Sequence, residues 1–288
     1  MNKIAVAGSL HYDIMIDAHH RPEKGETVMG TACRYKFGGK GGNQAISAAK
    51  HGSEVRFAGA VGADEQGRFL VETLRQAGVD ASAVAVVADA PSGMSVAISD
   101  REGDYGAVVV SNANQKIPAS VFQNARFWDR VSMLVLQNEV PETINIEAAS
   151  AAKQRRIPVC INAAPARPLS EPFAALIDIL IVNAIEARDM CGIEVEDLAS
   201  AQHAATLLAE RFAKVVVTAG EHGVAWCEAG KAAQALPARK IKLVSTHGAG
   251  DCFVGALCAS FTAGHSLAEA VASANAAAAR HVSQPATP

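Results

Sequence analysis

The chain has 288 residues, half of them hydrophobic, and a formal net charge of −3 at pH 7. This length and composition suit one main domain with a large core, and the lack of a basic excess excludes an electrostatic surface for nucleic acid or anionic membrane. Six cysteines without a paired C-x-x-C spacing argue against a disulfide framework or a zinc site.

The first predicted element is a short buried strand over residues 3–9, sequence KIAVAGS. The residues at this end of the sequence do not show the pattern of a signal peptide, and no apolar run in the sequence reaches membrane-spanning length. We therefore expect a cytoplasmic protein. His11 and Asp13 follow this strand directly, where ligands bind in open α/β sheets. Imidazole and carboxylate could together clamp hydroxyl groups. The alternative is a solvated loop in which Asp13 is a helix N-cap.

Two stretches depart from the pattern of a central sheet. Residues 21–27, RPEKGET, are typical of a turn and lead into loosely alternating residues up to 37. A second strand over 92–99 turns at residues 100–104 into another over 105–111. Two strand pairs from separate regions can build one small sheet, which we expect to stand apart from the main one.

Between these stretches lies a glycine-rich segment, FGGKGGNQA, at residues 37–45. It does not match the phosphate loop of P-loop NTPases, because Gly41 stands where that pattern needs Ser or Thr. The segment instead predicts a close backbone approach to a ligand at residues 38–39. A helix is expected to follow over residues 43–51.

The middle of the chain alternates strands with helices, which predicts a parallel sheet covered on both faces. A strand over 55–61 precedes a helix over 64–76 that residues 78–80 close. Further core strands are expected at residues 133–136, 157–162, 177–183 and 215–218.

Polar residues follow several of these strands, at the edge where α/β sheets bind ligands. Glu139 follows the strand over 133–136 and is either a ligand contact or an acid at a helix start. Asn183 and Glu186 form an N-x-x-E pattern which, taken alone, indicates helix capping. Thr218 and Gly220 form a Thr-x-Gly turn.

Near the C-terminus, a strand is expected over residues 239–244 and helices over 252–263 and 266–282. The GAG sequence at 248–250 joins the first two, so unpaired backbone N–H groups and a helix dipole should form an anion site there. Asp251 follows at the helix start. It is either a capping residue or a general base that faces the anion site.

Two motifs carry a resemblance to a known family. The STHGAGDCF sequence at 245–253, together with the glycine-rich segment at 37–45, resembles the paired signatures of the ribokinase-like (PfkB) carbohydrate kinases. The resemblance implies an α/β fold, a ribokinase-like three-layer α/β/α domain with a mostly parallel central sheet plus a small β-sheet lid. It also implies that residues 1–288 form a single kinase domain whose lid comprises about 11–37 and 92–111.

The activity implied is ATP-dependent transfer of the γ-phosphoryl group to a primary hydroxyl of a sugar, with a ribose-like substrate, in a Mg²⁺-dependent cytoplasmic enzyme. Asp251 is then the catalytic base, and the N–H groups of Gly248, Ala249 and Gly250 stabilise the transferring group. The acceptor sugar is assigned to His11, Asp13, Gly39, Lys40, Asn43 and Glu139. ATP is assigned to Asn183, Glu186, Thr218, Gly220, Gly223 and Asn275. Glu186 holds Mg²⁺ through water.

Many members of the family also pair through the lid, so a homodimer is expected, with neither nucleic acid nor membrane as a partner. Two residues depart from the family pattern. His11 replaces an Asn, and Ser245 replaces an Asp that helps to bind a monovalent cation, which argues against K⁺ activation. The alternatives are a nucleoside or fructose-type kinase and, from another class, a non-catalytic regulatory protein that binds sugar or nucleotide.

Overall fold

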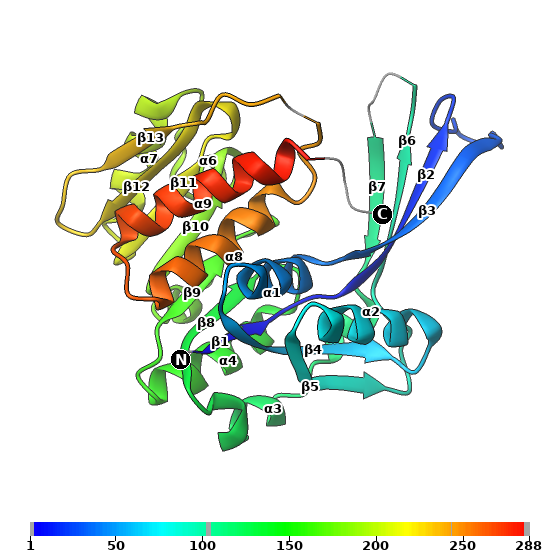
Figure 1. Cartoon of the computed structure of the whole chain (residues 1–288), viewed down its shortest axis with the longest axis horizontal. Helices are drawn as coiled ribbons and strands as arrows, with labels where there is room; N and C mark the ends of the chain where they lie inside the picture. Colours follow the sequence, from blue (N-terminus) through cyan, green and yellow to red (C-terminus); the bar gives the residue numbers. More distant parts are fainter. Residues whose placement is uncertain (1–2, 102–104, 243, 285–288) are drawn as a thin grey trace.

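The computed structural model describes residues 3–101, 105–242 and 244–284. Within these residues the main sheet has nine strands, in the order β13-β12-β11-β10-β9-β8-β1-β4-β5 (Figure 1). The strands from β11 to β5 pair in parallel, and only β12 and β13 run antiparallel to their neighbours. In chain order the strand bounds are β1 Lys3–Ala7, β4 Glu54–Gly62, β5 Val79–Val87, β8 Val131–Gln137, β9 Val159–Asn162, β10 Ile179–Asn183, β11 Lys214–Thr218, β12 Gly223–Glu228 and β13 Gln234–Pro237.

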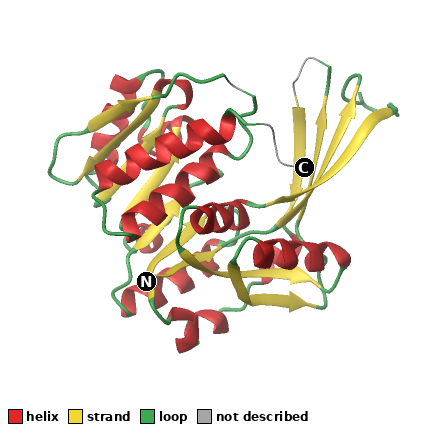
Figure 2. Cartoon of the chain, in the orientation of Figure 1, coloured by secondary structure: helices red, strands yellow, loops and turns green. Residues whose placement is uncertain are grey.

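Helices cover both faces of this sheet, because each strand points alternate side chains to opposite sides. In β1, Ile4 and Val6 join one buried cluster, whereas Ala5 and Ala7 join the other. The first cluster lies under α1 (Lys40–Lys50), α2 (Glu65–Gln76), α8 (Ala249–Thr262) and α9 (Leu267–Val282). The second lies under α4 (Glu142–Gln154), α5 (Glu171–Ala174), α6 (Ala184–Cys191) and α7 (Leu198–Leu208), with the short α3 (Ser120–Gln123) nearby. The three-layer α/β/α arrangement expected from the sequence is therefore confirmed (Figure 2).

A second sheet of four strands projects from one side of the main body (Figure 1). Its order is β3 (Gly30–Gly38), β2 (His11–Ala18), β6 (Met94–Ser99) and β7 (Tyr105–Val110). Strands β2 and β6 pair in parallel and the outer pairs are antiparallel. The two separate chain regions thus form one small sheet, as the sequence predicts; part of the expected turn, residues 102–104, lies outside the described residues.

Four local predictions are wrong. The helix expected over 252–263 begins three residues earlier, since α8 spans Ala249–Thr262 and has Gly248 as its N-cap. Residues 239–242 are irregular rather than a strand, and residue 243 is not described; the chain instead leaves the sheet after β13. Helix α1 begins at Lys40, earlier than expected, because Gly39 adopts φ 91° and serves as its N-cap. Residues 79–80 do not close α2 but begin β5, since their backbone pairs with β4, with Val79 opposite Val55 and Asp80 opposite Arg56.

Within the described part of the chain, none of the helices has both the length and the apolar character required to cross a bilayer.

Candidate active site

Asp251 lies in the first turn of α8, facing the N-terminus of α1. The N-cap of α8 is Gly248, in the left-handed conformation with φ 73°, so the capping interpretation of Asp251 is wrong. The Asp251 carboxylate instead accepts hydrogen bonds from Asn43 Nδ2 at 3.1 Å and Gln44 Nε2 at 3.0 Å. Both donors belong to α1, so the start of α1 holds a carboxylate that the start of α8 provides, although the two helices come from opposite ends of the chain.

Burial raises the pKa of Asp251 above its usual value, because a carboxylate loses its hydration inside the protein. The charge of Lys40 and the hydrogen bonds from Gln44 and Asn43 oppose this rise, and the charge of Glu139 adds to it. A carboxylate that is fixed by donors and has a raised pKa has the properties of a general base.

A network of buried side-chain amides holds Gln44, one of the two donors to Asp251. Gln44 Nε2 also donates to Asn162 Oδ1 at 3.1 Å, and Gln44 Oε1 accepts from Gln137 Nε2 at 2.8 Å. Asn162 in turn donates to the carbonyl of Ile181 at 3.3 Å. Gln44, Gln137 and Asn162 were not predicted as site residues. Gln137 and Asn162 end core strands and Gln44 lies near the start of α1, and these buried amides become neighbours only when the elements pack.

The residues assigned to the acceptor gather where β1 ends and β2 begins. Asp13 is buried in β2, so it is not an N-cap, and its Oδ1 accepts from Ser95 Oγ at 2.6 Å. Burial raises the pKa of Asp13, while the Ser95 hydrogen bond and the charges of His11 and then His247 oppose the rise. Buried His11 lies with Nδ1 3.9 Å from Glu139 Oε2, and among the described residues its Nε2 has no hydrogen-bond partner.

Glu139 connects the acceptor residues to the start of α1. Its Oε2 accepts from Ser9 Oγ at 2.5 Å and from the backbone N–H of Lys40 at 2.8 Å. Its carboxylate therefore binds the N-terminus of α1 rather than that of the helix that follows it, α4, and the helix-start interpretation is wrong. Gly39 must be glycine here, since a Cβ would lie 2.7 Å from the carbonyl of Ser9.

The N-x-x-E pair forms a complete capping box at the start of α6. Asn183 Oδ1 accepts from the backbone N–H of Glu186 at 2.9 Å, and Glu186 Oε2 accepts from the N–H of Asn183 at 2.8 Å. Burial raises the pKa of Glu186, and the Asn183 hydrogen bonds and the charge of Lys40 oppose it. The charge of Lys40 thus lowers the pKa of both Asp251 and Glu186.

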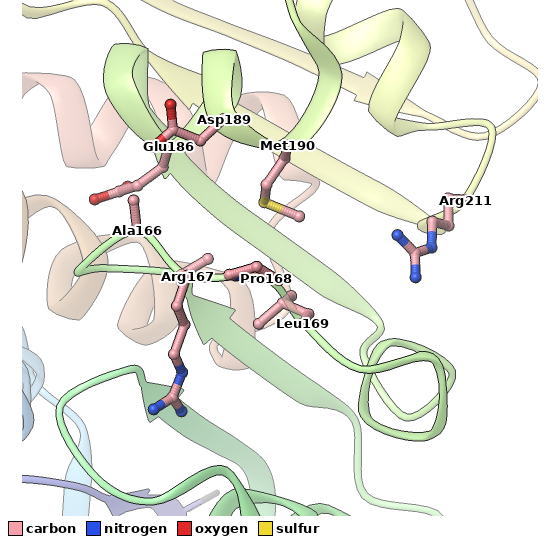
Figure 3. A pocket seen from close by; sticks show the side chains of 9 residues that line it. Ala166, Arg167, Pro168, Leu169, Glu186, Asp189, Met190 and Arg211 are labelled. Carbon is pink, nitrogen blue, oxygen red and sulfur yellow. The ribbon is translucent and has the colours of Figure 1, made fainter.

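A cavity of about 380 Å³ adjoins Glu186 on the flank of α6 (Figure 3). Arg167 points away from Glu186 and Asp189, so the charged groups on its wall do not converge on one point. The lining residues are Ala163, Ala166, Arg167, Pro168, Leu169, Glu186, Asp189, Met190 and Arg211.

The other residues assigned to ATP lie at the same edge of the sheet, where they differ in their contacts. Thr218 ends β11, and its Oγ1 is 3.4 Å from the carbonyl of Val182. Gly220 and Gly223 have φ 55° and 124°, and a side chain at Gly223 would strike the backbone of β13. Asn275 Nδ2 donates to the carbonyl of Pro237 at 3.0 Å, so this amide ties α9 to the end of β13.

The segment before α8 contains the substitution at Ser245. Its backbone N–H donates to the carbonyl of Val282 at 3.2 Å, and its Oγ accepts from the N–H of His247 at 3.2 Å. The hydroxyl of Ser245 therefore stabilises the turn that leads into Gly248.

Comparison with known proteins places this geometry in a family. A family model described as pfkB family carbohydrate kinase matches residues 1–287. The ribokinase of Bacillus subtilis is 34% identical over 279 residues, which cover 96% of this chain and 92% of the relative. The ribokinase of Mus musculus is 33% identical over 258 residues, which cover 88% and 80%.

The structural comparison agrees over the full chain. The structure of Arabidopsis thaliana ribokinase complexed with ribose and ATP superposes with a TM-score of 0.92 at 28% identity, covering 100% of this chain and 95% of that one. The resemblance inferred from the two glycine-rich motifs and the fold inferred with it are therefore confirmed. The chain belongs to the pfkB family of carbohydrate kinases and is an ATP-dependent sugar kinase.

Proposed function

We propose that this kinase transfers the γ-phosphoryl group of ATP to a primary hydroxyl of ribose or a ribose-like sugar. The observation that carries the proposal is the Asp251 carboxylate, which Asn43 and Gln44 fix at the N-terminus of α8 beside the buried group of His11, Asp13 and Glu139. A base, an anion site and a set of hydroxyl-binding side chains thus lie in one place. Ribose is proposed as the sugar because the relatives described above are ribokinases.

In the proposed reaction Asp251 accepts the proton of the attacking hydroxyl as its oxygen bonds to phosphorus and ADP leaves. The backbone N–H groups at the start of α8 stabilise the charge on the transferring group. Ala249 N–H already donates to the carbonyl of Thr246 at 3.2 Å, whereas among the described residues no carbonyl takes the N–H of Gly248 or Gly250. Gly248 and Gly250 are therefore the main donors we assign to this role.

Asp13 and Glu139 accept hydrogen bonds from sugar hydroxyls, and the unpartnered Nε2 of His11 is available to a third. Both carboxylates already accept hydrogen bonds from the protein, Asp13 from Ser95 and Glu139 from Ser9 and the backbone N–H of Lys40, which fixes their orientation before the sugar arrives. Such preorganisation lowers the entropy cost of binding.

The site fits a magnesium ion that arrives with the nucleotide. Among the described residues no three His, Cys, Asp or Glu side chains come together to coordinate a metal. Glu186 and Asn183 occupy one another at the start of α6, so they would hold the water shell of the ion rather than the ion itself. When bound, Mg²⁺ would neutralise charge on the phosphate oxygens.

The small sheet is the lid in this proposal, and its outer face is the dimer interface. One face contains His11, Asp13 and Ser95, and the other contains the aligned apolar side chains of Tyr12, Ile14, Ile16, Tyr35, Val96, Ile98, Val108 and Val110. Val108 and Tyr35 are 66% and 61% exposed in the monomer. A second copy of the chain would cover this apolar face.

The test is ADP release by the purified chain with ATP, Mg²⁺ and each of four acceptors: ribose, 2-deoxyribose, fructose and adenosine. We expect the highest kcat/KM with ribose, and mass spectrometry should place the phosphate on its primary hydroxyl. A preference for adenosine or fructose would replace the substrate while keeping the mechanism. Absence of turnover with all four acceptors, together with thermal stabilisation by ribose, would instead indicate a binding protein.

A further inference from the structure

The segment between β13 and α8 brings Gly248 to the site, and the end of α9 anchors it. The described residues of this segment before Gly248 form neither helix nor strand. The N–H groups of Val244 and Ser245 both donate to the carbonyl of Val282, at 2.8 and 3.2 Å. The His281 ring, one residue earlier on α9, places Nε2 2.9 Å from the carbonyl oxygen of His247. Only this last contact reaches the peptide group that contains the N–H of Gly248.

We propose that His281 is a positioning residue for phosphoryl transfer, acting through the peptide group that joins His247 to Gly248. This peptide is trans, so its C=O and N–H point in opposite directions. A donor that fixes the carbonyl oxygen of His247 on the α9 side therefore turns the N–H of Gly248 away from α9, toward the mouth of the α8 N-terminus. The inference rests on the proposed kinase reaction, because it assigns this N–H to the transferring phosphoryl group.

The proton on His281 follows from the chemistry of the contact. A carbonyl oxygen can only accept, so Nε2 must donate. The neutral Nε2–H tautomer and the imidazolium both provide this donor, and the contact persists in either state. A hydrogen bond to the carbonyl also polarises the peptide and strengthens its N–H as a donor.

The ring of His281 also lies beside Gly248 itself. Gly248 has φ 73°, a conformation that L side chains rarely adopt, and a Cβ at this position would lie 3.2 Å from His281 Nε2. The imidazole therefore stands against the glycine as well as bonding to the residue before it. The ring of His281 thus occupies space that a side chain at position 248 would need.

The test compares His281→Phe, which keeps a ring but removes the donor, with His281→Gln, whose amide can donate. His203→Phe is the matched control, since His203 is exposed on α7, away from the site. We measure kcat, the KM for ATP and for ribose, and the affinity for ADP with and without aluminium fluoride, a planar mimic of the transferring group.

We expect His281→Phe to lower kcat about tenfold, less than the loss of a whole oxyanion donor, while both KM values stay within about twofold. The affinity for ADP alone should not change in His281→Phe. The gain in affinity from aluminium fluoride should fall together with kcat, and His281→Gln should restore most of that gain and most of kcat.

Wild-type turnover of ribose in the same assay separates the two proposals. If the wild type turns over, wild-type kcat in His281→Phe, or a loss of ADP affinity as large as the loss of kcat, overturns the role of His281. If the wild type is inactive on every sugar, the proposed function fails and the role of His281 fails with it.

Discussion

At the scale of single residues, the site depends on how one carboxylate is surrounded. Asp251 is desolvated enough for its pKa to rise, yet each of its oxygens accepts an amide hydrogen bond and Lys40 lies near. Amide donors orient the carboxylate without protonating it. Asn43 and Gln44 therefore aim the oxygens of Asp251, and the charge of Lys40 offsets part of the rise in its pKa.

Replacement of Asp251 by Asn should abolish transfer, with kcat reduced at least about a thousandfold by loss of the base. ATP affinity should remain within a few-fold, because the backbone at the start of α8 is unchanged. Isothermal titration and single-turnover kinetics provide both quantities. The exposed Asp129→Asn is the control, and near wild-type turnover in the Asp251 variant would remove this residue from the mechanism.

The raised pKa of Asp251 predicts the pH profile. The base acts only when deprotonated, so kcat/KM should fall as the pH drops through a pKa above that of an ordinary aspartate. Lys40→Gln removes a charge that lowers this pKa and should move the acid limb to higher pH. Lys50→Gln, at the far end of α1, should leave the midpoint where it is. An unshifted midpoint in the Lys40 variant would show that Lys40 does not act on the base.

At the scale of elements, the distance between α1 and α8 decides whether the donors reach the base. Gly255 of α8 faces α1 so closely that a Cβ would lie 2.7 Å from the backbone N of Ala48 and against the side chain of Ser47. Ser47 Oγ also donates to the carbonyl of Cys252 at 2.9 Å, which joins the two helices. The small residue at 255 allows Asn43 and Gln44 to approach Asp251.

Gly255→Ala should therefore separate the helices, because the backbone of α1 cannot yield as a flexible side chain could. We expect a loss of about 1–3 kcal/mol in the free energy of unfolding, measured by urea denaturation, and a reduced kcat at saturating substrates. An alanine variant as stable and as active as the wild type would show that the contact between α1 and α8 is loose.

At the scale of the whole molecule, the two faces of the small sheet have separate chemistries. In β2 the polar residues at 11 and 13 alternate with the apolar residues at 12, 14 and 16, so a single strand carries residues proposed to bind the sugar on one face and residues proposed to meet the partner subunit on the other. Closure of the lid and dimer formation would thus involve the same strands.

A charge on the apolar face should separate the proposed dimer. Val108→Glu places a carboxylate among the aligned apolar side chains, where its desolvation is costly, and sedimentation velocity should show a shift from dimer to monomer. Val86→Glu is the control, since Val86 is 65% exposed at the edge of the main sheet. A wild-type chain that sediments as a monomer at all concentrations would contradict the dimer itself.

The sequence by itself determined the alternation of strands and helices, the existence of a separate small sheet and the family. These features depend on local periodicity and on glycine-rich motifs, and both are visible in short stretches. It also brought Asp251, Asn43, Asp13 and Glu139 into consideration, because each follows a core strand or begins a helix.

Only the tertiary structure decided how these residues contact one another. The amide network of Gln44, Gln137 and Asn162, and the contact of His281 with the segment before Gly248, join residues far apart in the chain. No local pattern marks such residues, since a buried amide and a histidine at a helix end look ordinary until the elements pack. The strand expected over 239–244 is wrong for the same reason: β13 is the edge strand of the sheet, and Val244 and Ser245 donate their N–H groups to the end of α9 instead of to a neighbouring strand.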